Sequence, residues 1–142
     1  MNRILVLVVS QNHTEARVLR NVLREQSGGE ATVVGIAGRG EEVLSRSLAL
    51  RPNAILINFS RADEGELEII PRLRGMVLEA GIVAITPPEI VFEEMARAAG
   101  ADAVVARTNV AVGLLPAIRR AAQAADWRRQ ITDQSAEEEE AP

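Results

Sequence analysis

Short apolar runs alternate with amphipathic stretches along most of the chain. The first run, residues 4–9, is apolar at every position, which is typical of a strand buried on both faces of a sheet. Each such run is followed by a stretch with apolar residues at helical spacing. The predicted strands cover residues 4–9, 32–37, 54–59, 82–86 and 103–106, and the predicted helices cover residues 13–26, 41–50, 67–77, 91–99 and 114 to about 129.

The order of these elements predicts the fold class. Five strand–helix units favour an α/β fold, in which a parallel sheet has helices on both faces, because parallel crossovers must cover the sheet. Periodicity alone does not predict the order of the strands. The spacing also predicts which helix faces pack inward, and for the first and fourth helices these are Val18, Leu19, Val22 and Leu23, and Val91, Met95, Ala98 and Ala99.

Charge is distributed unevenly along the 142 residues. The net charge is −4, but residues 133–142 hold five acidic residues and no basic one, and all 16 basic residues of the chain are arginine. Residues 1–132 are therefore close to neutral, which does not favour a nucleic-acid partner. We expect a domain over residues 1–130 and an acidic, disordered tail over residues 131–142, because such like-charged segments bury little apolar surface.

The composition bears on membrane association and on the cellular location of the protein. No apolar run approaches the roughly 18 residues of a membrane span, so no membrane partner is expected. The chain has no cysteine, which excludes disulfides and thiolate metal sites and favours a cytoplasmic location.

Polar side chains follow several of the predicted strands. In an open parallel sheet, ligands bind beyond the carboxyl ends of the strands, so these side chains should converge. They are Ser10, Gln11, Asn58, Thr86 and Arg107.

Three longer stretches resemble one family. Residues 35–58, 99–107 and 114–122 are similar to the second helix and third strand, the turn and fifth strand, and the last helix of response-regulator receiver domains, the CheY-like domains of two-component signalling. The resemblance covers residues 2 to about 125, and the last stretch is most similar to the NarL/FixJ-type branch. It implies a flavodoxin-like three-layer sandwich with five helices and a five-stranded parallel sheet of order 2-1-3-4-5. Members of that branch usually carry a DNA-binding domain afterwards; none follows here, so we expect a stand-alone domain.

The resemblance also assigns roles to the polar positions. The family's Mg2+-binding acidic pair falls on Ser10 and Gln11, and its phosphoacceptor aspartate falls on Asn58. The family's hydroxyl is kept as Thr86, while its lysine falls on Arg107 and its aromatic switch residue on Val104.

These departures predict a pocket without the family's chemistry. An amide is a far weaker nucleophile than a carboxylate, and Mg2+ prefers carboxylate and phosphate ligands. We therefore expect a degenerate receiver with no bound cofactor and no enzymatic activity. Arg107 is expected to hydrogen-bond the Asn58 side-chain oxygen or to pair with Asp63 or Glu64, which would hold the loop in one state. The alternative is a weak anion site that includes Arg107.

The favoured function is a phosphorylation-independent protein-interaction module. Its partner would be a kinase, another regulator or a second copy, bound through the face of helix four, strand five and helix five that receivers use. The residues expected on or near that face are Glu93, Glu94, Arg97, Val104, Arg119, Arg120 and Trp127. One alternative is a phosphorelay protein with an unorthodox acceptor, Ser60 or Ser10. Another is a small flavodoxin-like nucleotide- or flavin-binding protein, which the 2% aromatic content disfavours.

Three local features have modest interpretations. Residues 35–40 contain three glycines in the wrong order for a dinucleotide fingerprint, so we expect a turn. Trp127 either caps the core or forms an exposed contact cluster with Arg128 and Arg129. The acidic tail has two interpretations, a solubilising end or a segment that folds back on the arginines of the last helix, which are Arg119, Arg120, Arg128 and Arg129.

Overall fold

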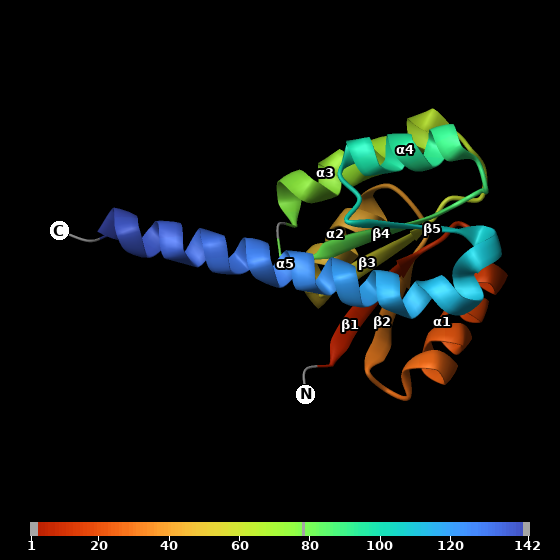
Figure 1. Cartoon of the computed structure of the whole chain (residues 1–142), viewed down its shortest axis with the longest axis horizontal. Coiled ribbons are helices and arrows are strands. Elements are labelled where there is room, and N and C mark those ends of the chain that lie inside the picture. The colour runs from red at the N-terminus through yellow and green to blue at the C-terminus, as the bar shows by residue number, and fades with distance from the viewer. Residues whose placement is uncertain (1–2, 78, 141–142) are drawn as a thin grey trace.

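The computed structural model describes residues 3–77 and 79–140, and it describes side-chain surroundings as far as residue 134. Strands and helices alternate along this part of the chain (Figure 1). The elements are β1 (Ile4–Val9), α1 (His13–Ser27), β2 (Ala31–Ala37), α2 (Glu41–Leu50), β3 (Ala54–Asn58), the 3-10 helix η1 (Glu64–Glu68), α3 (Ile69–Met76), β4 (Gly81–Thr86), α4 (Ile90–Ala99), β5 (Ala103–Ala106), the 3-10 helix η2 (Arg107–Asn109) and α5 (Val110–Glu140).

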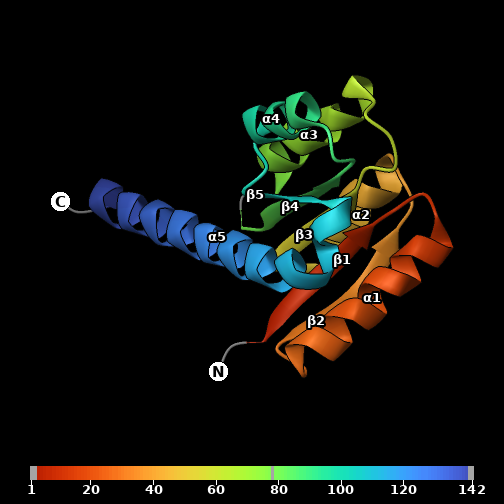
Figure 2. The same ribbon diagram turned by 45° about the vertical axis from the view of Figure 1, so that its right-hand side comes forward.

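All five strands are parallel and lie in the order β2-β1-β3-β4-β5. Helices α1 and α5 pack on one face of the sheet, and α2, α3 and α4 pack on the other (Figure 2). Alternate residues of β1 enter the two cores, with Val6 and Val8 on the α1/α5 side and Leu7 and Val9 on the other. This explains the unbroken apolar run, and it confirms the predicted three-layer fold and strand order.

Two of the predicted inward faces are rotated from their observed positions. In α4, Phe92 and Ala96 are buried, whereas Val91 is 67% exposed. Phe92 packs edge-on against Phe59, with ring centroids 5.8 Å apart, and burying this larger side chain determines the rotation of the helix. In α1, Leu19 and Leu23 are buried, but Val18 is more than half exposed.

Helix α5 continues to Glu140, well beyond the predicted end near Arg129. The disorder expected for residues 131–142 stays a prediction, and residues 141 and 142 lie outside the described part. After Pro116 the sequence has no glycine or proline before Pro142, and it is rich in alanine and glutamate, which favour helix. The helix passes the end of the sheet and projects away from the other elements in both views (Figures 1 and 2).

Helix α5 is seated on the sheet by a close backbone approach. A Cβ atom at Gly81, the first residue of β4, would lie 2.1 Å from the carbonyl oxygen of Ala121. Only glycine fits at this distance, so the strand and the helix are in direct backbone contact here.

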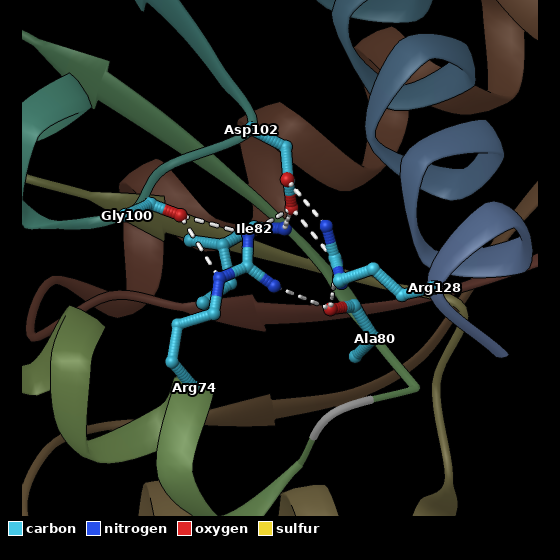
Figure 3. Close-up of polar contacts among 6 residues, drawn as sticks. All are labelled: Arg74, Ala80, Ile82, Gly100, Asp102 and Arg128. Carbon is cyan, nitrogen blue, oxygen red and sulfur yellow. Dashed lines mark hydrogen bonds and ion pairs between the residues drawn. The ribbon is translucent and has the colours of Figure 1, made fainter. Parts of the chain in front are cut away.

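A half-buried carboxylate, Asp102, gives α5 a second attachment to the body of the protein (Figure 3). Arg128 of α5 donates to Asp102 Oδ1 at 2.8 Å, and Arg74 of α3 donates to Oδ2. The backbone N–H of Ile82 also donates to Oδ2, at 2.8 Å. Burial alone would raise the pKa of Asp102, but the hydrogen bonds from Arg128, Arg74 and Ile82 outweigh it and lower the pKa. Asp102 therefore links α3, β4 and α5 as an ionised group.

Candidate functional site

The carboxyl ends of the strands bring three of the predicted polar residues together. Ser10 follows β1, Asn58 is the last residue of β3 and Arg107 follows β5. These side chains are joined through Asn58. Gln11 lines the adjoining pocket and is exposed, whereas Thr86 is fully buried.

The Asn58 amide has hydrogen-bond partners on both of its polar atoms. Its nitrogen donates to Glu15 Oε2 at 2.7 Å and to Ser10 Oγ at 3.3 Å. Its oxygen accepts from Arg107 Nη2 at 3.0 Å. The amide group is therefore fixed in orientation, with its nitrogen toward α1 and its oxygen toward β5.

Arg107 connects the end of β5 to the loop after β3. Its Nη2 donates to the Asn58 oxygen and, at 2.7 Å, to the backbone carbonyl of Phe59. The expected hydrogen bond between Arg107 and Asn58 is thus confirmed. The structure records no Arg107 contact with the two loop acids in its described part; Asp63 instead accepts from the backbone N–H of Gly65 at 3.0 Å.

The acid that faces Arg107 is Glu15, which the sequence analysis missed. Its Oε1 lies 3.8 Å from Arg107 Nη1, and its Oε2 also accepts from the Ser60 hydroxyl at 3.4 Å. Asn12 caps α1 by accepting from the Glu15 N–H, which places Glu15 in the first turn of the helix. An Asn cap with an acid three residues later, directly after a strand, is the pattern that could have located this side chain at the carboxyl edge.

A pocket of about 240 Å³ opens beside this cluster. Its wall includes Ser10, Gln11 and Asn58, together with the segment Gly38–Gly40. This segment forms a turn in which Gly40 has a positive φ of 63°, and the backbone N–H of Gly38 donates to Glu42. The turn itself therefore agrees with the sequence interpretation. Phe59 is the sole aromatic residue in the wall and is buried, so no ring is exposed for stacking on a flavin.

The side chains present fit a divalent cation poorly. The pocket wall contains two acids, Glu66 and Glu68, and two arginines, Arg39 and Arg72. Mg2+ is usually held through carboxylates, and in the cluster around Asn58 the candidates are the hydroxyl of Ser10, the amides of Gln11 and Asn58, and one carboxylate. That carboxylate, Glu15, is already engaged by Asn58 and faces Arg107. In the described part of the chain, no group of three or more His, Asp or Glu side chains could hold a metal ion.

The residues of the predicted interaction face do not all lie together. Glu94 and Arg97 form an exposed pair on α4, with 3.3 Å between Oε1 and Nη1. Arg119 of α5 instead pairs with Glu30 at 2.7 Å, on the side of α5 toward the α1–β2 turn. The Arg119 hydrogen bonds lower the pKa of Glu30.

The remaining members of the predicted face lie on three elements. Glu93 is half-buried on α4, Val104 is half-buried on β5, and Arg120 is exposed on α5. Trp127 is 64% exposed, whereas Arg128 is engaged by Asp102. The alternative of an exposed Trp–Arg contact cluster is therefore wrong for Arg128. Trp127 is exposed, whereas the neighbouring Arg128 points inward.

Several solved structures similar to this chain are described as response regulators or their receiver domains. One is the response regulator domain of CheB from Thermotoga maritima, with a TM-score of 0.71 and 21% identity over 86% of this chain and 98% of that one. Another is a LuxR-family two-component response regulator from Aurantimonas sp. SI85-9A1, with a TM-score of 0.75 and 20% identity over 87% of each chain. A third is the signal receiver domain of the putative response regulator NarL from Mycobacterium tuberculosis, with a TM-score of 0.66 and 20% identity over 84% of this chain and 98% of that one.

No protein-family model and no curated protein matches this chain. The structural likeness extends over most of the chain and shows that it has the CheY-like receiver fold. Within the described residues, no helix is long and apolar enough to cross a membrane.

Proposed function

We propose that this chain is a degenerate receiver domain of two-component signalling, which binds protein partners without being phosphorylated. The observation that supports this function most directly is the position of Asn58. It occupies the end of β3 and is held by Arg107, Glu15 and Ser10. An amide at this position has no carboxylate oxygen to attack a phosphoryl donor.

The Arg107 contacts explain how the domain would signal without phosphate. Receiver-type switches order or release loops through charged contacts, and here Arg107 already binds the loop through the Phe59 carbonyl. The loop after β3 is therefore held in one state by the chain's own side chains. The proposed role is constitutive binding of a kinase, a regulator or a second copy, and it requires no catalytic activity.

The proposal is tested with acetyl phosphate and Mg2+, read by intact mass. The wild-type protein should gain no phosphate under conditions that phosphorylate an active receiver domain run as a positive control. Hydrogen exchange of residues 59–65 should also be unchanged by the reagent, whereas Arg107→Ala should accelerate it. A stoichiometric gain of phosphate by the wild-type protein would reject the proposal.

The same experiment identifies the main alternative, a phosphorelay protein with a serine acceptor. Ser60 is exposed, and its hydroxyl donates to the Glu15 carboxylate at 3.4 Å, an arrangement in which a carboxylate faces a potential nucleophile. Ser10 is 2% exposed, and its hydroxyl is bonded to the Asn12 carbonyl. If phosphate were gained and then lost in Ser60→Ala but not in Ser10→Ala, this alternative would replace the proposal.

A further inference from the structure

The outer surface of α5 carries large apolar side chains where the helix leaves the sheet. Trp127 is 64% exposed and Ile131 is 46% exposed, and they lie four residues apart on one face. Arg128 and Arg129 between them face inward, since Arg128 bonds Asp102 and Arg129 donates to the Glu79 carbonyl at 3.4 Å. The Trp127/Ile131 face therefore points away from the protein body.

This outer face follows a spacing of three and four residues. We call the set Arg120, Ala124, Trp127, Ile131 and Gln134 the outer stripe of α5. Such spacing is that of the contact seam between two packed helices. Arg120 and Gln134 are exposed and Ala124 is half-buried, so the stripe is accessible along its length.

The stripe is self-complementary when two copies run antiparallel. If the pair is centred at position 129, Trp127 of one chain lies against Ile131 of the other, and Ala124 lies against Gln134. Because the pair has twofold symmetry, each contact occurs twice. The same alignment brings the Arg120 region beside the other copy's residues 137–140, which are four glutamates. Charge therefore favours the antiparallel over the parallel arrangement.

The direction in which α5 projects is compatible with a second copy as the partner. The helix is continuous to Glu140, so its acidic end extends away from the arginines of its own chain instead of folding back on them. Figures 1 and 2 show the projecting part clear of the other elements. A pair over positions 120–138 would be about 28 Å long at 1.5 Å per residue, which is a small interface.

We infer that this chain forms a twofold antiparallel dimer through the outer stripe of α5. The contact lies beyond the α4–β5–α5 face, and it specifies a second copy as a partner. It does not depend on whether the pocket takes phosphate, so its failure would leave the proposed function standing.

Sedimentation equilibrium of the whole chain, from about 1 µM to about 1 mM, tests the dimer, because small interfaces are weak. We expect reversible monomer–dimer behaviour. Trp127 is the only tryptophan, so its emission should shift to shorter wavelength as the dimer forms. Trp127→Ala should raise the dissociation constant at least about 30-fold, as loss of a central aromatic anchor does. Val112→Ala, at a 73% exposed site outside the stripe, should leave it unchanged.

Orientation is tested by crosslinking, because the chain has no cysteine of its own. Ala124→Cys and Gln134→Cys proteins are mixed and oxidised, and the products are separated by mass. The mixed disulfide should exceed both homodimers, since an antiparallel pair places these two positions opposite each other.

A monomer at every concentration would overturn the inference. So would a dimer that Trp127→Ala leaves intact but Arg97→Glu on α4 disrupts, or a dominant Ala124→Cys homodimer. Circular dichroism of each variant separates loss of dimer from loss of folding.

Discussion

Asn58 is a polar side chain whose hydrogen bonds tie together three elements at the carboxyl edge of the sheet. Both of its polar atoms are engaged, and its partners come from the end of β1, the first turn of α1 and the end of β5. Thr86, at the same edge of the sheet, differs from Asn58 in its hydrogen bonding. The Thr86 hydroxyl is fully buried and has no hydrogen-bond partner among the described atoms.

Replacing Thr86 with valine tests this difference. A buried hydroxyl without a partner loses its hydrogen bonds to water on folding and forms none in return. Thr86→Val should therefore leave the free energy of unfolding unchanged or raise it by up to about 1 kcal/mol. Urea unfolding measures the change. Ser47→Ala is the matched control, because that buried hydroxyl donates to the Val43 carbonyl at 2.6 Å and its loss should cost about 1 kcal/mol. Destabilisation of Thr86→Val by more than its control would show that the hydroxyl is bonded.

Part of this site was predictable from sequence and part was not. Strand ends and the receiver resemblance were enough to place Ser10, Asn58 and Arg107 at one edge and to anticipate the Arg107–Asn58 bond. Glu15 was missed because its role depends on the direction in which α1 leaves β1. That direction depends on how the helix packs in the folded protein, and in the sequence only the Asn12 cap indicates where the helix begins.

At the scale of elements, the Asp102 cluster determines how α5 sits. The carboxylate accepts from Arg128, Arg74 and the Ile82 amide, and Arg74 also donates to the Gly100 carbonyl at 2.7 Å. Removing one member of such a partly buried set leaves charges without partners, and solvent screening reduces the cost of doing so.

Asp102→Asn should therefore lower the free energy of unfolding by about 1 to 2 kcal/mol near neutral pH, less than for a fully buried pair. Because folding lowers the Asp102 pKa, its contribution is complete above its ordinary value of 3.8 and is lost as the pH falls through the lower folded-state pKa. Denaturant titrations between about pH 6 and about pH 2 should show a flatter pH dependence for the variant than for the wild type. Glu94→Gln, at an exposed pair, is the control and should change little. An equal pH dependence in the Asp102 variant and the wild type would contradict the assignment.

The elements also show where sequence patterns stop being informative. Every predicted strand and helix is present because the alternation of apolar runs and turn residues is strong. The predicted inward face of α4 was wrong, because the periodicity of the sequence did not show whether Val91 or Phe92 faces the core. The contact between Phe92 and Phe59 turns Phe92 inward. The predicted end of the last helix, near Arg129, differs from the observed end at Glu140, because the alanines and glutamates of this segment favour helix.

At the scale of the whole molecule, the fold is that of a receiver, and the charged side chains at the carboxyl edge of its sheet include both acids and arginines. The wall of the pocket beside Asn58 contains two arginines, Arg39 and Arg72, and two acids, Glu66 and Glu68, so it has no excess negative charge for a cation to neutralise. Glu15 and Arg107 form an opposed pair in a second pocket that shares Asn58. A ligand that binds only the folded state raises the melting temperature, which makes metal affinity measurable without any activity.

The melting temperature should thus be the same with and without about 10 mM Mg2+, at matched ionic strength. The double variant Gln11→Glu/Asn58→Asp is the comparison, because it adds two carboxylates at the pocket wall and should gain stability when Mg2+ is present. A rise for the wild type with Mg2+ but not with Na+ would contradict the expectation.

Helix α5 is attached to the rest of the protein at two places, the backbone contact at Gly81 and the Asp102 cluster. Its backbone meets β4 at Gly81, and among its side chains described as far as residue 134 the last polar contacts with the body are at Arg128 and Arg129, so the part of the helix beyond them is an arm that projects from this seat. That arm is about 17 Å long at 1.5 Å per residue, and a tilt of about 10° at the seat would move its tip by about 3 Å. Small rearrangements around Asp102 are therefore amplified at the acidic end, where a spectroscopic label would detect them.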